Sequence, residues 1–404
     1  MSKKVAILGW GEDTQDIEPW LKKQGHQVTI LDEKEKSFGD LAGYDMLVRS
    51  PGVYRYRKEI VEAETAGVEV TSKTKIFFDI CPAHIIGVTG TKGKGTTSSL
   101  IYEMLKAGGK DVYLGGNIGK GMFEFLDKLT PNSWVVLELS SFQLIDLTKS
   151  AHVGVVLMTT SDHLDWHKNV DEYRLSKANL IKYQTPQDFA VISGDYEGSR
   201  WIGQFGQGKK ILVSRKDWPK AMGIRGEHHR ENVAAAAAVA KILNVRSQIV
   251  EKVAAEFKGL EHRLEEVATV NGVTYFDDSI STVPETTIAA IKSFTEPLIL
   301  IAGGSEKGSD FTKLGAEIAQ AKNIKAVILV GLMAERIKAA IQKASGKVRL
   351  LEGAKKMSEI VNQAKGVAKP GDIVVLSPAA ASFDMFTSYK DRGDQFKKQV
   401  KKSI

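Results

Sequence analysis

Residues 85–99 read IIGVTGTKGKGTTSS, and this stretch decides the fold of the chain. A β-branched apolar run leads into a glycine-rich loop, and apolar residues at helical spacing follow the loop. A strand that ends in such a loop at a helix N-terminus directs backbone N–H groups toward phosphate, and Lys94 can reach the outer phosphates. The stretch predicts a binding loop for a nucleotide triphosphate. The alternative is a tight strand–helix turn, because Val88 and Gly95 depart from the strict phosphate-loop pattern.

The composition is that of a globular protein that can build more than one core. The chain has 404 residues, 43% of them hydrophobic and 26% charged, with a net charge of +7. The length suggests two or three domains. Lysines are dispersed and no basic stripe with interleaved aromatic residues occurs, so we expect anionic small molecules rather than nucleic acids as partners.

The sequence carries no sign of export or of a membrane span. The single cysteine, Cys81, excludes an internal disulfide and fits a reducing compartment. The first apolar run is too short for a signal peptide, and no run approaches the roughly 18 apolar residues of a membrane helix. We therefore expect a cytoplasmic protein.

Strand-like and helix-like patterns alternate along the whole chain, which indicates an α/β protein with parallel sheets. Pro82 marks the first junction. We predict three α/β domains in series: a Rossmann-like domain over 1–82, a phosphate-loop domain over 83–261 and a second Rossmann-like domain over 262–404. The active site is expected in the cleft where the domains meet.

The expected strands are short apolar runs rich in β-branched residues. They lie at 4–9, 27–32, 44–50, 68–72, 85–88, 134–140, 152–158, 188–193, 273–278, 297–304, 325–331 and 372–378. Helical spacing is expected at 17–24, at 57–66 and in an alanine-rich segment at 232–243. Gly9 and Gly11 after the first strand match a dinucleotide fingerprint only in part, since Thr14 replaces its third glycine. A nucleotide cradle and a plain turn remain open there.

Three polar residues follow strands of the predicted central sheet. Glu138 ends an apolar strand, and an acid at such a position can hold Mg²⁺ beside phosphates because this hard cation prefers oxygen ligands. The alternative is an ordinary strand-terminal glutamate. His163 lies in a polar cluster after the next strand, as a metal ligand or as a hydrogen-bonded side chain. Asn117, in the motif GGNIG, could reach a phosphate or a sugar.

Further candidates lie on later segments. The spacing around Lys177 indicates a solvated helix lysine, whereas Arg263 could clamp a phosphate or an acyl anion. Asp277 and Asp278 precede a run of hydroxyl residues, an arrangement that suits a helix N-cap and also ribose or amine recognition. Lys307, in a second glycine turn, can pair with a carboxylate.

Together these motifs resemble the Mur ligase family, ATP-dependent enzymes that form amide bonds in peptidoglycan synthesis. The motifs span nearly the whole chain in order: GTKGKGTT (90–97), GGNIG (115–119), ELSSFQL (138–144), SDHLDWH (161–167), YRLSK (173–177), GLEHR (259–263), DDSISTVPETTIAAI (277–291), GGSEKGSDF (303–311), SPAAASFDMF (377–386) and RGDQF (392–396). The motifs ELSSFQL, DHLDWH, SPAAASFDMF and RGDQF resemble the branch that adds D-glutamate.

The resemblance implies ATP and Mg²⁺ as cofactors, and UDP-N-acetylmuramoyl-L-alanine and D-glutamate as substrates of a monomer. The first domain would bind the UDP substrate, the second ATP and the third the amino acid. The residues that match the family's nucleotide-binding positions are Gly90, Thr91, Lys92, Gly93, Lys94, Gly95, Thr96, Thr97, Asn232 and Arg263. Among them Lys94 would contact the β- and γ-phosphates.

The resemblance also assigns the metal, catalytic and substrate residues. Glu138 and His163 would bind Mg²⁺ together with the hydroxyl of Thr96 or Thr97, because Gly95 offers none. Lys177 matches a carbamylated lysine whose negative charge serves the metal site, and the remaining catalytic residue, Asp278, would lie near the reacting groups. The residues that would contact the UDP substrate are Asp32, Ser50 and Asn117. The residues that would contact D-glutamate are Thr282, Lys307, Ser382 and Tyr389.

Three departures leave alternatives open. Gly95 replaces the hydroxyl residue that is usual after the loop lysine, and this loop variant also resembles folylpolyglutamate synthases. His229 stands where asparagine is usual in the motif on the adenine side, and Ile280 stands where many members have lysine. A ligase that uses a pteridine substrate, and a nucleotide-binding protein with a decayed site, are therefore the alternatives. In the implied reaction an acyl phosphate forms and the amine of D-glutamate attacks it. Either Asp278 or the departing phosphate would take the proton.

Overall fold

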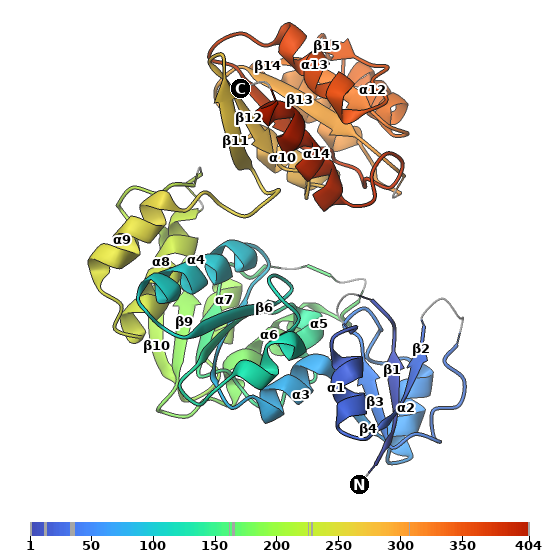
Figure 1. The fold of residues 1–404 in the computed structure, drawn as a ribbon, viewed down its shortest axis with the longest axis vertical. Helices are drawn as coiled ribbons and strands as arrows, with labels where there is room; N and C mark the ends of the chain where they lie inside the picture. Colours follow the sequence, from blue (N-terminus) through green and yellow to red (C-terminus); the bar gives the residue numbers. More distant parts are fainter. Residues whose placement is uncertain are drawn as a thin grey trace. The chain divides into compact units, whose positions relative to one another are not determined.

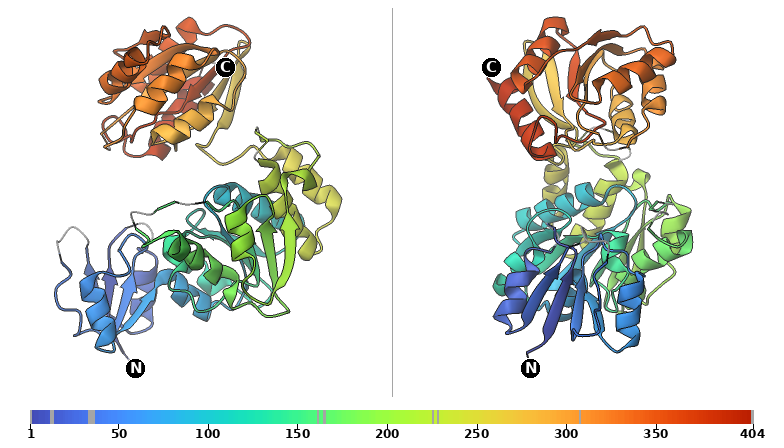
Figure 2. Two further views of the ribbon diagram at one scale, coloured as in Figure 1. Left: turned by 180° about the vertical axis from the view of Figure 1, so that it is seen from behind. Right: turned by 90° about the vertical axis from the view of Figure 1, so that its right-hand side faces the viewer.

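The computed structural model describes residues 2–11, 14–32, 37–160, 162–163, 166–224, 226–227, 229–306 and 308–402. Three β-sheets organise these residues, each with helices on both faces (Figures 1 and 2). The chain forms two compact units, Met1–Phe257 with the first two sheets and Lys258–Ile404 with the third. This α/β architecture was predicted, whereas the exact domain boundaries stay a prediction. No described helix is long and apolar enough to cross a membrane.

The first sheet is parallel throughout, in the order β2-β1-β3-β4. Its elements are β1 (Lys4–Leu8), α1 (Ile17–Lys23), β2 (Gln27–Leu31), β3 (Met46–Arg49), α2 (Lys58–Thr65) and β4 (Glu69–Ser72), followed by α3 (Lys73–Ile80). Alternate residues of β1 face opposite sides. Val5 and Ile7 share a core with α1, while Ala6 and Leu8 share one with α2.

The central sheet is also parallel, in the order β10-β9-β8-β5-β7-β6. Its strands are β5 (His84–Thr89), β6 (Val112–Gly116), β7 (Trp134–Glu138), β8 (Val153–Val156), β9 (Phe189–Ser193) and β10 (Lys209–Val213). Its helices are α4 (Lys94–Ala107), α5 (Ser141–Leu144), α6 (Val170–Lys182), α7 (Glu197–Ile202), α8 (His229–Ile242) and α9 (Ser247–Glu256), with short 3₁₀ turns η1 (Met122–Glu124), η2 (Leu126–Lys128) and η3 (Arg215–Asp217).

The two faces of the central sheet have separate cores. Helices α4, α8 and α9 pack on one face, where α8 lies against α4. Helices α5, α6 and α7 contribute to the core on the other face, which α3 shares through Phe77 and Phe78. Helix α3 lies between the first two sheets (Figure 1), so their cores are continuous.

The third sheet has the order β11-β12-β16-β13-β14-β15. Its elements are β11 (Glu265–Val270), β12 (Val273–Asp277), α10 (Pro284–Ile291), β13 (Leu298–Gly303), α11 (Thr312–Gln320), β14 (Ile324–Val330), α12 (Ala334–Lys343), β15 (Arg349–Leu351), α13 (Met357–Val367), β16 (Ile373–Leu376) and α14 (Tyr389–Lys401). Helices α10, α11 and α12 share one core with the sheet, and α13 and α14 share another.

The third sheet is parallel, as predicted, except at one edge. Strand β11 runs antiparallel to β12 and was not predicted. The turn between them is Asn271–Gly272, with φ of +50° and +77°. Positive φ at both central residues is the conformation that favours Asn-Gly in a two-residue hairpin, so the signal was present in the sequence.

Buried ion pairs hold the first sheet against the central one. Arg49 ends β3, and its fully buried guanidinium donates to the Asp146 carboxylate at 2.6 Å, beyond the end of α5. Arg55 donates to the other oxygen of Asp146 at 2.8 Å. Within the first domain, Lys73 at the start of α3 and Asp16 before α1 form a further buried pair at 2.6 Å, with both side chains 8% exposed.

We predict that Arg49→Met destabilises the unit of residues 1–257. Removing Arg49 leaves the buried Asp146 carboxylate with one of its two arginines, at a cost of about 3 kcal/mol. Urea unfolding should show this loss. Lys3→Met is the matched control, because Lys3 pairs with Glu69 at 2.6 Å on the surface and should change stability by less than about 1 kcal/mol. Equal effects of the two substitutions would contradict the structural role of Arg49.

Candidate active site

The predicted phosphate loop joins β5 to α4. Gly90 and Gly93 have φ of +153° and +89°, conformations that favour glycine, and Gly93 is the N-cap of α4. A Cβ on Gly93 would lie 2.4 Å from the side-chain oxygen of Asn232 in α8. The structure thus brings Asn232 directly onto the loop, and the absence of a side chain at Gly93 allows this approach.

Two lysines converge on one carbonyl of this loop. The Nζ atoms of Lys94 and Lys177 donate to the Gly90 oxygen at 3.1 Å and 3.0 Å. Lys177 is 2% exposed, and burial followed by the nearby charge of Lys94 lowers its pKa well below the usual value. The interpretation of Lys177 as a solvated helix lysine was therefore wrong. Spacing within α6 did not reveal that the strand ends cover this face of the helix.

The first turn of α4 carries buried hydroxyl groups suited to an ion or phosphate. Thr96 and Thr97 are 4% and 0% exposed. The hydroxyls of Thr97 and Ser98 have no hydrogen-bond partner among the residues that the structure describes. Buried polar atoms are normally paired, so unsatisfied oxygens at a helix N-terminus fit a bound ligand. Their chemistry also fits Mg²⁺, which takes oxygen ligands.

Thr91 has a different function in the loop. Its hydroxyl lies 2.8 Å from the Tyr173 hydroxyl and accepts the N–H of Thr160 at 3.1 Å. Burial raises the pKa of Tyr173 to about 12. Tyr173 was not predicted as a site residue, although it lies one turn before Lys177. Its ring also lies 4.6 Å from the Lys177 Nζ, so it anchors both the loop and the buried lysine.

The structure places Glu138 and Asn117 side by side. Glu138 is the last residue of β7, 9% exposed, and pairs in register with Val88 of β5 and Gly116 of β6. The N–H of Asn117 donates to the Glu138 carbonyl at 3.0 Å. Both residues therefore lie at the carboxyl edge of the sheet next to the phosphate loop, because β5 and β7 are neighbours.

His163 lies in a loop well beyond the end of β8, not at the strand end itself. It is exposed and adopts φ of +53°, and its Nε2 lies 3.7 Å from the Asp162 carboxylate. Its ring lies 4.8 Å from that of Phe142. Nearby His167 is buried and its Nε2 meets the Ser141 hydroxyl at 2.9 Å, so this second histidine holds the loop.

Asp32 and Ser50 lie at one edge of the first sheet. They follow the ends of β2 and β3, which flank β1. Between them Gly9 has φ of +80°, and a Cβ there would lie 2.8 Å from Val53. The buried Thr14 hydroxyl donates to the Gly9 carbonyl at 3.2 Å, so Thr14 shapes the turn where the fingerprint has glycine.

Asp278 is a buried carboxyl group in the second compact unit. It accepts the N–H of Leu264 at 3.1 Å and the hydroxyl of Ser377 at 2.7 Å. Burial raises its pKa to about 6, against the lowering effect of these hydrogen bonds and of Arg263. The interpretation of Asp278 as an N-cap was wrong, because Val283 precedes α10 in that position.

Arg263 is exposed and near enough to act electrostatically on Asp278. Its neighbour His262 is buried and meets the Asp277 carboxylate at 2.7 Å, which raises the pKa of the histidine. The same carboxylate accepts the N–H of Ser279 at 2.9 Å. Asp277 thus fixes the backbone on both sides of the predicted catalytic aspartate.

The predicted D-glutamate residues fall on three segments of this unit. Thr282 is half-buried, Ser382 is 2% exposed, and Tyr389 begins α14. Lys307 lies outside the described residues. Arg392 was missed as a site residue, although its motif was noted.

Arg392 is 2% exposed and organises the segments around it. Its guanidinium donates to the Ser279 hydroxyl at 2.9 Å and to the carbonyl oxygens of Ser279, Ala380 and Ala381. Desolvation by burial lowers its pKa to about 10. It therefore connects the Asp278 segment to the Ser382 segment.

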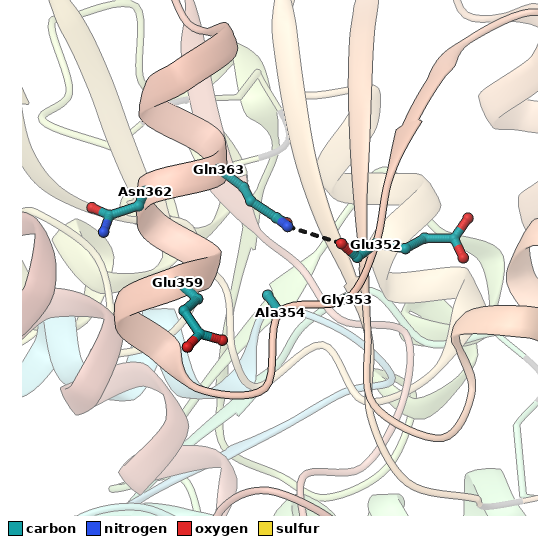
Figure 3. A pocket seen from close by; sticks show the side chains of 6 residues that line it. All are labelled: Glu352, Gly353, Ala354, Glu359, Asn362 and Gln363. Carbon is teal, nitrogen blue, oxygen red and sulfur yellow. Dashed lines mark hydrogen bonds between the residues drawn. The ribbon is translucent and has the colours of Figure 1, made fainter.

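A pocket elsewhere in this unit contains none of the predicted site residues. It lies between the end of β15 and α13, and Gln363 crosses it to donate to the Glu352 carbonyl at 2.9 Å (Figure 3). Its lining residues are Glu352, Gly353, Ala354, Glu359, Asn362 and Gln363. With two carboxylates at its wall it does not suit the anionic ligands considered above.

Two family models match the chain. The Mur ligase middle domain matches residues 88–217, and the Mur ligase, glutamate ligase domain matches residues 262–380. A protein of Acetivibrio thermocellus named UDP-N-acetylmuramoylalanine–D-glutamate ligase is 37% identical, with 99% of this chain and 96% of the relative covered. One of the same name from Clostridium kluyveri is 34% identical, with 98% and 96% covered.

Solved structures show the same fold. The UDP-N-acetylmuramate-alanine ligase MurC of Thermotoga maritima has a TM-score of 0.61 at 16% identity, and both chains are covered completely. The MurF ligase of Thermotoga maritima in complex with ADP has a TM-score of 0.57 at 17% identity, with 100% of this chain and 96% of that chain covered. With relatives at 37% and 34% identity along nearly its whole length, this chain belongs to the Mur ligase family.

Proposed function

We propose that this protein is an ATP-dependent, ADP-forming ligase that adds D-glutamate to UDP-N-acetylmuramoyl-L-alanine in peptidoglycan synthesis. The observation that carries the proposal is the match to ligases of that name along nearly the whole chain. The phosphate loop, with Asn232 against Gly93 and two lysines at Gly90, supports the nucleotide part of the activity.

The chemistry requires that a carboxylate be activated before an amine can displace its oxygen. The γ-phosphoryl group of ATP moves to the terminal carboxylate of the UDP substrate, which gives an acyl phosphate and ADP. The neutral amine of D-glutamate then attacks the acyl carbon, and phosphate leaves from the tetrahedral intermediate. All reactants are anions, so Lys94 and the loop N–H groups must offset their mutual repulsion. Arg263 adds a further cation on the second unit.

The donor set suits Mg²⁺. Glu138, His163 and the hydroxyl of Thr96 would hold it, and the unsatisfied hydroxyl of Thr97 is a further oxygen of the right type. When bound, Mg²⁺ supplies positive charge to the transferring phosphoryl group. The chain's own contribution is to keep these donors in place at the edge formed by β5 and β7.

Lys177 is chemically prepared for carbamylation. A buried amine with a lowered pKa has more of its neutral, nucleophilic form. Its nitrogen can attack CO₂, forming an N–C bond with loss of a proton, and the product is an anion. That charge change would turn the repulsion between Lys177 and Lys94 into attraction and would add an anionic group to the metal site.

Asp278 is proposed to receive the proton of the attacking amine. Its pKa of about 6 keeps it ionised at neutral pH yet makes it more basic than an exposed aspartate. Thr282, Ser382, Tyr389 and Lys307 are proposed to bind D-glutamate, and Asp32, Ser50 and Asn117 the UDP substrate. We further propose a cytoplasmic monomer that acts on these small molecules without nucleic acid or membrane.

Phosphate release tests the function. Orthophosphate and ADP should appear only when ATP, UDP-N-acetylmuramoyl-L-alanine and D-glutamate are all present, and Lys94→Ala should reduce the rate by about 10³-fold because it removes charge stabilisation of the transferred group. Lys106→Ala, on the exposed side of the same helix, is the control. Turnover with folate derivatives instead would favour a folylpolyglutamate-synthase-like ligase. Absence of turnover with either substrate would favour a binding protein.

Replacing Lys177 should abolish most activity, and small carboxylates should restore part of it. Lys177→Ala leaves space that acetate or formate can fill, so either anion can stand in for the carbamate. The rescue is measured as the initial rate with about 0.1 M acetate relative to the rate with the same concentration of chloride. The chloride control is needed because this ionic strength already screens charges over about 10 Å. Lys182→Ala, an exposed lysine of the same helix, should remain active. Full activity of Lys177→Ala would remove this lysine from the site.

The rate should fall on the acid side as Asp278 gains a proton. Its ionised form predominates above a pH of about 6, so kcat/KM for D-glutamate should decrease about tenfold per pH unit below that value. Asp278→Asn should lower kcat and eliminate this limb of the profile. Asp310→Asn, an exposed aspartate of the same unit, should keep it. An unchanged acid limb in Asp278→Asn would assign the proton transfer to another group.

A further inference from the structure

The segment YRYR at 54–57 has no part in the proposed reaction, yet its rings contact the central domain. Tyr54 meets Trp166 edge-on, with ring centroids 5.6 Å apart and planes at 87°. The Nζ of Lys168 lies 3.6 Å from the centre of the Tyr56 ring. Trp166 and Lys168 follow His163 in the loop after β8, so both contacts fall on the loop that carries a candidate metal ligand.

A carboxylate at the start of α6 completes the contact of Tyr56. Burial, followed by the interaction with Glu172, raises the pKa of the Tyr56 hydroxyl to about 12. The Glu172 carboxylate also accepts the N–H of Lys168 at 2.9 Å and lies 3.5 Å from Nδ1 of His167. The Glu172 carboxylate therefore interacts with Tyr56 of the first domain and with His167 and Lys168, the two residues that follow Trp166.

The ring of His163 contacts Phe142, and Phe142 in turn contacts Trp166, the residue that Tyr54 meets. Phe142 lies 4.8 Å from His163 and 4.6 Å from Trp166, measured between ring centroids. The Phe142 carbonyl accepts a hydrogen bond from Arg49 at 2.8 Å. Among the described residues, the His163 side chain also contacts the Asp162 carboxylate at 3.7 Å and the ring of Tyr173 at 6.4 Å.

The ring contacts through Phe142 and Trp166 matter because the His163 side chain is exposed. His163 also has a left-handed backbone, and in the described part of the chain its ring contacts come from Phe142 and Tyr173, outside its own loop. The backbone N–H groups of Trp166 and His167 both donate to the His163 carbonyl, at 3.1 Å and 3.0 Å. Any displacement of Trp166 is therefore transmitted to the backbone of His163.

We infer that Tyr54 and Tyr56, which we name the tyrosine clasp, are positioning residues that hold residues 162–163 and 166–168 so that His163 can bind the metal ion. The inference rests on the proposed function in one respect, the assignment of His163 as a metal ligand. It assigns to the first domain a second contribution besides substrate binding, because that domain orders part of the phosphate-transfer site.

The test compares a clasp variant of the full chain with a matched surface variant. Tyr54→Ala/Tyr56→Ala removes both rings from the loop. Tyr183→Ala removes a ring that is 43% exposed at the end of α6 and lies 5.5 Å from a lysine Nζ, so it loses a similar cation–π contact away from the loop. Hydrogen exchange should become about tenfold faster at the amides of residues 162–163 and 166–168 in the clasp variant only.

Metal binding supplies the second readout. Mn²⁺ affinity, followed by electron paramagnetic resonance with ADP present, should fall about tenfold in the clasp variant, as outer-shell substitutions generally cause. Tyr54→Phe retains the aromatic ring and should bind Mn²⁺ like the wild type. Neither measurement requires turnover, so a failure of D-glutamate addition and a failure of this inference are distinguishable.

Two outcomes would overturn the inference. One is loop exchange and Mn²⁺ affinity in the clasp variant equal to those of Tyr183→Ala. The other is lower stability to urea with unchanged Mn²⁺ affinity, which would limit the clasp to joining the two domains. If the double variant does not fold, Tyr54→Ala decides the question. It removes the ring that meets Trp166, and a Mn²⁺ affinity equal to the wild type would contradict the clasp.

Discussion

Two ammonium groups meet at the carbonyl oxygen of Gly90, and the rest of the site depends on this arrangement. Lys94 reaches it at 3.1 Å from the N-terminus of α4, and Lys177 at 3.0 Å from within the core. Burial, followed by the repulsion from the nearby charge of Lys94, lowers the pKa of Lys177 well below its usual value. Anions relieve that repulsion. A triphosphate, an acyl phosphate and a carbamate are all anions, so the substrates and the proposed modification would each reduce the repulsion between Lys94 and Lys177.

The surrounding fold keeps this loop rigid. Gly90 and Gly93 adopt conformations that favour glycine, Asn232 closes on Gly93, and Thr91 is fixed by Tyr173. Preorganised dipoles and charges of this kind stabilise transferred groups without reorganising during the reaction. The first domain contributes Arg49 and Arg55, which both donate to the Asp146 carboxylate of the central domain. It also contributes the Tyr54 ring, which contacts Trp166 after His163.

The sequence predicted most strands to within a few residues, and it predicted the phosphate loop, because both follow from local patterns. It failed where the deciding contact is long-range. Lys177 looks solvated within its helix, and only the packing of α6 against β5 buries it. The segment Val112–Gly116 was not among the predicted strands, yet it forms β6 because its backbone pairs with β7. The contacts of Tyr54 and Tyr56 likewise join distant segments, so no local pattern could indicate them.

A crystal structure with Mg²⁺ and a non-hydrolysable ATP analogue would test the proposed arrangement around the phosphate loop most directly. We expect a γ-phosphate oxygen at about 3 Å from the Lys94 Nζ. We also expect one Mg²⁺ that a phosphate oxygen contacts at about 2.1 Å, on the side of the site that carries Glu138 and His163. A triphosphate bound away from residues 90–97, or a metal ion held by neither Glu138 nor His163, would contradict the proposed site.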